Sequence, residues 1–394
     1  MVNEPTGKAS GNPPLTEMAQ LAKLIMKMGP DIDLIARISG QYKETIRYRY
    51  KEKILAKGFA LQARLNFEGM GLRRVVMTAR LGDTYMPYAK EVFTAMNKLC
   101  YLTSAAELMP QGTYMLHATV PSQFTSDFTQ FMKRLEQLGI FSSIEFYNFA
   151  WFRNVPMRAE YFNFDQGIWE FDWEKPVEHS KEDHDAGFEP FSVDKIDLLI
   201  MKELQVDATR SLSEIRETIK AVDGIDINYK TLAWHWIRHV QEKRMVNGYA
   251  LRWMGTRYDP TSEKMVFRKH RYMVVPILVR GVTDVERVNL VSEANKVPFL
   301  WSEAAGEDYY AQFAFPVETV NFAFNFLTSV LAKFGKRASH YVVDQTNSAG
   351  FTLSYQLFDD GEREWKFEKE EILVRFQNLI MKIGEGSGSP RNSA

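Results

Sequence analysis

Apolar positions along the first 80 residues follow a helical spacing and then an extended one. After Thr16, apolar residues three and four positions apart predict an amphipathic first helix, through Met18, Leu21, Leu24, Ile25 and Met28. Two further helices and two extended stretches are predicted over 31–38, 42–56, 59–67 and 73–80. A three-helix unit followed by strands is typical of a winged helix-turn-helix, so we expect one here.

The same order returns in the second half of the chain. After Ser192, one face of a predicted helix carries Ile196, Leu199, Ile200 and Leu204. Ser211 and Glu214 have the spacing of a capping box that opens a second helix, and a third helix spans about 228–244. Two extended stretches, 249–258 and 264–268, flank Asp259-Pro260-Thr261, which predicts a hairpin wing.

Each helical part is followed by a pattern that reads strand, helix, strand, strand, helix, strand. In the first half the segments are 75–81, 87–98, 101–108, 113–120, 122–138 and 142–148. In the second half they are 272–279, 284–295, 299–305, 309–315, 317–334 and 338–343. This order is that of the ferredoxin-like βαββαβ fold. Each half then ends in a hairpin centred on an Asp-x-Gly sequence.

Similar residues recur between the two halves at nearly constant offsets. The matching segments are 161–167 with 355–361 at an offset of 194, 101–106 with 299–304 at 198, and 42–43 with 229–230 at 187. Offsets that drift by a few residues are expected when loops of different length separate two copies of one unit. We therefore expect an α+β protein with two tandem repeats, about 1–188 and 189–394, each a winged helix-turn-helix plus a ferredoxin-like sandwich domain.

The expected divisions follow from these patterns and from an acidic stretch without periodicity between the copies. In chain order they are a flexible N-terminus (1–14), winged helix-turn-helix 1 (15–68), sandwich domain 1 with its hairpin (72–173), an acidic linker (174–189), winged helix-turn-helix 2 (190–269), sandwich domain 2 with its hairpin (270–368), an amphipathic helix (369–383) and a disordered tail (384–394).

Composition excludes several classes. The 394 residues carry a formal net charge of −1, so any binding of nucleic acid must come from local clusters of Lys and Arg. The single cysteine, Cys100, has no partner for an internal disulfide, and residues 1–16 lack the apolar stretch of a secretory signal. No run approaches the roughly 18 apolar residues that span a bilayer. We therefore expect a cytoplasmic protein without membrane contact.

The plan resembles the leucine-responsive regulator (Lrp)/AsnC family of prokaryotic transcription factors, which carry a RAM-type sandwich domain. The resemblance rests on copy two, at 193–211, Val282-Thr-Asp284 and Gly306-Glu-Asp-Tyr309; copy one has only the looser Gln111-Gly112-Thr-Tyr114. Family members pair through their sandwich domains, and many sense amino acids. The resemblance thus implies a double-stranded-DNA-binding regulator, an amino-acid-like small-molecule effector and a pairing that the two copies can make within one chain.

In such a unit the third helix lies in the major groove of DNA. In copy one, Lys43, Arg47 and Lys51 share one stripe, and Gln41 and Thr45 lie near the helix start where base edges are read. In copy two the expected contacts are Asn228, Lys230, Thr231, Trp234, His235 and Arg238, with Arg252 and Arg257 of the wing reaching phosphates. A lone basic helix is more often just solvated, but two at equivalent places favour DNA binding.

Oligomeric state depends on the last helix. Residues 369–382 carry an apolar stripe that either packs on its own domain or joins two chains. The sequence favours both interpretations equally, and we expect a homodimer from the second.

No catalytic pattern stands out. His235 and His239 have a spacing that can hold a metal, but no HExxH motif or cysteine accompanies them, so we expect phosphate or solvent contact, no metal and no cofactor. His117 falls in a predicted strand, where a satisfied sheet histidine is the usual role. The chain is therefore expected not to be an enzyme.

Two rival interpretations remain open. Siroheme decarboxylases share this architecture and sometimes occur as fused pairs, but their histidine-centred wing has no match, because 252–257 reads Arg-Trp-Met-Gly-Thr-Arg. The other rival is a scaffold whose winged helices bind protein in the transcription machinery.

Overall fold

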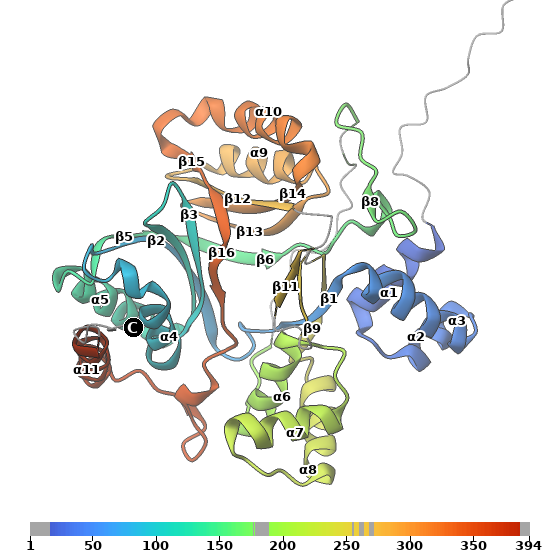
Figure 1. Ribbon diagram of the computed structural model, residues 1–394, viewed down its shortest axis with the longest axis horizontal. Coiled ribbons are helices and arrows are strands. Elements are labelled where there is room, and N and C mark those ends of the chain that lie inside the picture. Colours follow the sequence, from blue (N-terminus) through green and yellow to red (C-terminus); the bar gives the residue numbers. More distant parts are fainter. Residues whose placement is uncertain are drawn as a thin grey trace, which may run out of the picture.

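The computed structural model describes residues 16–175, 177, 189–253, 256–259, 264–267 and 272–386. Figure 1 shows two three-helix units, two helix-covered sheets and a two-stranded ribbon between them. This is the expected α+β fold, with a helix-turn-helix and a ferredoxin-like domain in each copy. No helix among these residues is both long and apolar enough to cross a membrane. The acidic stretch 178–188 and both termini of the chain lie outside the described residues.

The first helical unit is held by its caps and by one apolar core. Its helices are α1 (Glu17–Met28), α2 (Ile32–Ser39) and α3 (Lys43–Tyr48), which continues as a π-helical turn over Arg49–Ile54 and a 3-10 turn over Leu55–Lys57. The Thr16 hydroxyl accepts from the Ala19 amide at 3.1 Å and caps the start of α1. Ile25, Ile35 and Ile46 are fully buried where the helices meet.

The second helical unit repeats this design. Its helices are α6 (Lys195–Val206), α7 (Leu212–Asp223) and α8 (Tyr229–His235), which continues as a π-helical turn over Trp236–Gln241. The predicted Ser211–Glu214 capping box is present, and a second one joins Asp194 to Asp197 at the start of α6. The wing is a hairpin of β10 (Thr256–Asp259) and β11 (Lys264–Phe267), whose tip lies outside the described residues. Its expected first strand, 249–258, is divided, because residues 249–253 pair with 59–63 of copy one instead.

The two sandwich domains have the same topology. The first is formed by β2 (Leu72–Leu81), α4 (Ala89–Cys100), β3 (Leu102–Met109), β4 (Thr113–Pro121), α5 (Thr125–Gln137) and β5 (Phe141–Tyr147). The second is formed by β12 (Tyr272–Val279), α9 (Asp284–Ala294), β13 (Leu300–Gly306), β14 (Tyr309–Pro316), α10 (Val320–Leu331) and β15 (Ala338–His340). Strand orders β3-β4-β2-β5 and β13-β14-β12-β15, with antiparallel neighbours, confirm the predicted ferredoxin-like order.

The copies exchange strands, which the sequence patterns did not predict. Strand β6 (Phe149–Asn154) leaves copy one and pairs with β13 of copy two, while β16 (Val342–Gly350) of copy two pairs with β3 of copy one. Between the helical units, β1 (Phe59–Leu65) pairs with β9 (Val246–Trp253) along its whole length. Helix α1 packs against β9 and α6 against β1, so each helical unit contacts the ribbon strand of the other copy. The pairing expected within one chain is therefore present.

The two terminal hairpins are exchanged as well. Hairpin β7–β8 (Phe162–Asn163 and Ile168–Trp169) leads into aromatic residues that contact Phe299 of copy two: Trp169, Phe171 and Trp173. Hairpin β17–β18 (Phe358–Asp359 and Glu364–Trp365) packs on Tyr101 of copy one, and the Trp365 indole donates to the Met70 carbonyl at 3.1 Å. These aromatic residues therefore pack between the two copies.

Helix α11 (Lys369–Gly386) lies on α4 and α5 of copy one. Its apolar stripe is buried there through Ile372, Phe376 and Ile380, with the Phe376 and Phe131 ring centroids 6.3 Å apart. Neither interpretation of this stripe was right, since it covers the opposite copy rather than its own domain or a second chain.

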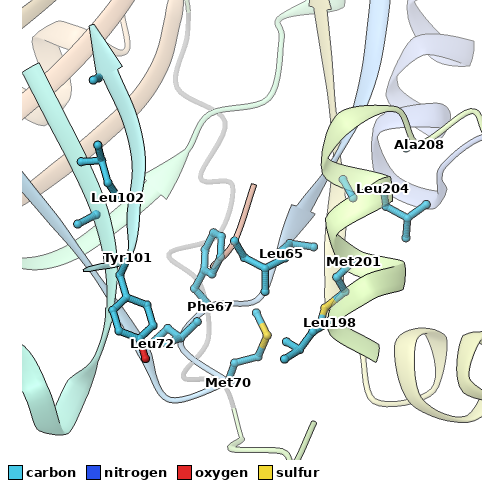
Figure 2. Packing of buried hydrophobic residues seen from close by; sticks show 14 of the residues in the cluster. Leu65, Phe67, Met70, Leu72, Tyr101, Leu102, Leu198, Met201, Leu204 and Ala208 are labelled. Atoms are coloured by element: carbon cyan, nitrogen blue, oxygen red, sulfur yellow. The ribbon is translucent and has the colours of Figure 1, made fainter. Parts of the chain in front are cut away.

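The connection from β1 to β2 ties these parts together. Figure 2 shows Leu65, Phe67, Met70 and Leu72 between Tyr101 and Leu102 on one side and α6 on the other. All of these side chains belong to one buried cluster that also includes Leu198 and Met201 of α6. The helical units and the first sandwich domain therefore share a single core.

Substitutions on α11 test its packing on copy one. Phe376→Ala removes a fully buried ring and should lower the free energy of unfolding by about 3–5 kcal/mol in urea denaturation. Val374→Ala, on the same helix but 56% exposed, should change it by less than about 0.5 kcal/mol. Equal effects of the two substitutions would contradict the packing described here.

Candidate ligand site between the two sheets

The inner faces of the two sheets pack against each other. The buried side chains that meet there come from both copies: Val76, Leu108, Met115, Tyr147, Phe149, Val274, Leu278, Ala304, Tyr310 and Val343. Successive residues of a strand point to opposite faces, so residues two apart from these also face the interface. Arg74, two residues before Val76, is placed on this inner face by the strand itself.

A cavity of ≈ 630 Å³ lies between the sheets and the β1–β9 ribbon. Its charged and titratable lining groups are Arg64 from β1, Arg74 from β2, His117 from β4, Arg252 from β9 and Tyr272 from β12. The described residues that line it include no aspartate or glutamate, and an adjoining hollow that Arg64 and Arg74 also line includes Glu68. Arg64 and Arg252 also line an adjoining hollow whose other walls include Met157, Phe299 and Trp301. The site therefore combines cationic groups with aromatic and uncharged polar side chains.

Arg74 is held over two aromatic rings. Its guanidinium carbon lies 4.5 Å from the ring centroid of Phe152 and 4.9 Å from that of Phe67. The Asn154 side-chain amide is oriented with its oxygen toward Arg74, and this oxygen accepts from both Arg74 Nη atoms at 3.1 and 3.2 Å. Two ring faces and a neutral amide thus help to hold the guanidinium in place.

Arg252 of β9 also lines the cavity. Its guanidinium carbon is 5.4 Å from the Trp301 ring centroid, and Tyr272 packs edge-on against the same indole at 4.9 Å. Burial lowers the pKa of Arg252 from its usual value. Among the described residues no carboxylate forms an ion pair with Arg252. A buried cation of this kind is stabilised when an anion binds beside it.

His117 faces the cavity from the middle of β4. Its Nε2 atom is 3.4 Å from the Tyr310 hydroxyl, which donates to the Gln312 side chain at 3.1 Å. Burial and, second, the nearby Arg74 cation lower the pKa of His117 to about 4. The imidazole is therefore neutral near pH 7.

The site is not symmetric between the copies. His117 pairs in register with Val76 and Ser104, and Gln312 of β14 pairs in the same way with Pro276 and Ser302. His117 and Gln312 thus occupy equivalent positions of the two copies. Only copy one places a titratable side chain there.

The copy-one residues expected to contact DNA lie on or near α3. Lys51 and Thr45 are exposed, whereas Lys43 pairs with Asp33 at 2.5 Å and Arg47 with Glu44 at 2.5 Å. The Gln41 side chain accepts from Arg49. Much of the positive charge along this stripe is therefore already paired within the unit.

The copy-two residues separate into two groups. Exposed residues on the α8 surface are Asn228, Lys230, Thr231, Trp234 and Arg238, although Arg238 pairs with Glu242 at 2.9 Å. His235 is only 7% exposed because its helical position turns it toward α6, where it contacts Asp197. Arg252 lines the cavity instead of the wing surface. Both placements differ from the exposed ones expected. The Arg257 side chain lies outside what the structure describes.

Sequence reasoning missed Arg64 and Arg74 and gave His117 only a structural role. The sequence did contain an indication of Arg74, because it lies two residues from Val76 and therefore on the same face of the strand. A charged residue at such a position is costly unless it has a partner or a ligand.

Comparisons with known proteins add little beyond architecture. No protein-family model and no curated protein sequence matches this chain. The solved structure of the siroheme decarboxylase NirDL is similar with a TM-score of 0.49 at 9% identity, over 93% of this chain and 99% of that one. NirDL in complex with an iron-uroporphyrin III analogue gives 0.48 at 8%, over 93% and 100%. The structure of PH0061 gives 0.25 at 13%, over 36% and 96%. Because these likenesses are weak, the fold assignment rests on the strand order and register described above.

The lowered pKa of His117 predicts a pH effect on stability. Unfolded histidine titrates near pH 6.5, so between about pH 6.5 and 4 the unfolded chain binds more protons at this residue than the folded one. Acidification through this range should therefore destabilise the protein relative to His117→Gln, by at most about 1.4 kcal/mol per pH unit. Urea denaturation of both proteins at pH 7, 5.5 and 4.5 measures the difference. A constant difference would show that His117 titrates normally.

Proposed function

We propose that the inter-sheet cavity binds a ligand with several carboxylates on a flat apolar body, as in a carboxylated tetrapyrrole. Of the functions considered from the sequence, the geometry best supports the alternative, a siroheme decarboxylase-like enzyme. The observation that carries the proposal is the cavity lining, in which Arg64, Arg74 and Arg252 come together beside aromatic side chains.

Guanidinium groups suit such a ligand. Each can bind a carboxylate through two parallel N–H donors, and the low dielectric of a cavity strengthens these bonds. Trp301, Phe152 and Tyr272 supply apolar surface between the cationic groups. An amino acid, the effector implied by the regulator resemblance, carries one α-carboxylate and would leave most of this cationic lining unused.

Decarboxylation requires little more of the protein than binding and a proton. The carboxylate leaves as CO₂, and the carbon that carried it takes up one proton. Among the described lining residues, the Tyr272 hydroxyl carries a proton at neutral pH, and the neutral His117 imidazole can relay one from solvent between its two ring nitrogens. His117 can thus supply the imidazole that the histidine-free segment 252–257 does not, although it comes from a sheet strand rather than a wing.

Binding is tested by titrating the purified protein with siroheme and following its visible absorption. Arg74→Leu and Arg252→Leu should each weaken binding about ten- to one hundred-fold, the cost of one charge-assisted hydrogen bond. Arg80→Leu is the matched control, because Arg80 lies on β2 like Arg74 but is exposed to solvent. Unchanged binding in both cavity variants would overturn the assignment of the site.

Catalysis is read out separately as CO₂ release from bound siroheme. His117→Gln gives copy one the residue that copy two has, and it should retain binding while release of CO₂ falls. Binding without any turnover by the unmodified protein would reduce the proposal to a tetrapyrrole-binding protein.

DNA binding stays a second candidate function, supported by a different observation. Figure 1 places α3 and α8 at separate outer corners of the molecule, and neither is covered by a sheet. Tyr42 and Tyr229, near the starts of these helices, are 88% and 51% exposed. Exposed helix starts at two corners of one chain are compatible with contact to two segments of a duplex.

The triple substitution of Lys43, Arg47 and Lys51 by Ala tests this candidate. It should weaken duplex binding and reduce the slope of log affinity against log salt by about 0.9 for each phosphate that the variant no longer neutralises. Fluorescence anisotropy at several salt concentrations measures both. A control variant removes three exposed lysines elsewhere: Lys90, Lys133 and Lys336. An effect no larger than that of the control would exclude α3 as a recognition helix.

A further inference from the structure

Four potential metal ligands meet where α8 packs on the start of α6. Asp194 and Asp197 lie at the N-terminal end of α6, and His235 and His239 lie one turn apart on the third helix. One ligand atom from each of the four lies within 4.8 Å of all the others. The sequence indicated the histidine spacing but not the two carboxylates, since they come from another helix.

The separations between these atoms fit one small cation. His235 Nδ1 is 2.9 Å from Asp197 Oδ1 and 3.4 Å from Asp194 Oδ2. His239 Nδ1 is 2.9 Å from Asp197 Oδ2 and 3.8 Å from Asp194 Oδ2. Tetrahedral Zn²⁺ with bonds of about 2.0–2.1 Å requires its ligand atoms about 3.3 Å apart. The observed distances lie on both sides of this value.

Asp197 is the member that most needs a cation. Its carboxylate is fully buried, and among the described residues no lysine or arginine forms an ion pair with it. Its contacts are the two imidazoles and the backbone N–H of Asp194. A fully buried carboxylate whose side-chain partners are two imidazoles is a costly arrangement for stability alone.

The surroundings leave access for an ion. The four residues line an open cavity of ≈ 420 Å³, whose rim includes Lys243 and Arg363. The Lys243 ammonium group donates a hydrogen bond to the Ser192 carbonyl at 3.2 Å. Trp234 packs edge-on against His239, with ring centroids 4.6 Å apart, and so fixes the orientation of that imidazole.

We propose that Asp194, Asp197, His235 and His239 bind one divalent transition-metal ion of the Zn²⁺ class, which joins the third helix of the second helical unit to the start of α6. Two imidazole nitrogens with two carboxylate oxygens are a donor set that such ions accept. With four protein ligands, the ion has a structural role. The site lies apart from the inter-sheet cavity and does not depend on the function proposed for it.

The test uses full-length, tag-free protein, stripped of metal and titrated with Zn²⁺ by calorimetry. The background carries His179→Ala and His184→Ala, because these two histidines lie outside the described residues. One Zn²⁺ per chain should bind and raise the thermal midpoint. Co²⁺ in place of Zn²⁺ should give the visible absorption of a tetrahedral site.

Variants identify the ligands. His239 and Asp194 are the two less buried ligands of the four. His239→Gln and Asp194→Asn should each lower the affinity for Zn²⁺ by more than the roughly 10–100-fold expected for loss of a residue that only hydrogen-bonds to a ligand. His340→Gln, an exposed histidine of β15, is the control. Circular dichroism checks that each variant is folded.

Absent Zn²⁺ binding, or binding that survives both ligand variants, would overturn the proposal. Siroheme titration of the same variants should be unchanged, so failure here is distinguishable from failure of the proposed function.

Discussion

The antiparallel pairing of β1 with β9 is the constraint on which the rest of the structure depends. It joins strands from opposite copies residue by residue, from Phe59 opposite Trp253 to Leu65 opposite Val246. Once the ribbon forms, each helical unit packs on the partner strand and the two sheets are held face to face. The exchanged strands β6 and β16, the two terminal hairpins and α11 extend the same principle, since each packs on the opposite copy.

This arrangement creates an electrostatic problem as well as a core. Arg64 and Arg252 are carried toward the sheet interface by the ribbon, and Arg74 reaches it from β2. The buried Glu303 carboxylate of β13 is satisfied within the fold, since it accepts from Arg153 and from Tyr309 at 2.7 Å. Three guanidinium groups that line one cavity distinguish this part of the interface from the apolar packing around it.

Local pattern was enough to predict the elements and their order, because periodicity and caps act within a few residues. The Ser211–Glu214 capping box, the wing hairpin and both ferredoxin-like orders are present as expected. Strand exchange could not be predicted, because the local sequence pattern does not determine whether β6 pairs with its own sheet or with the other one. The cavity forms only because of that exchange, so the sequence did not show that its lining residues lie together. His235 was predicted as exposed because helical spacing alone does not show which side α6 covers.

Covalent joining of the copies has a consequence for what the interface can become. In a homodimer a two-fold axis forces every substitution to appear on both sides of the shared cavity. Here one side holds His117 and Arg74, while the equivalent register position in the other copy holds Gln312. A single chain can therefore give one half of an inherited symmetric interface a chemical role and leave the other half to shape and orientation.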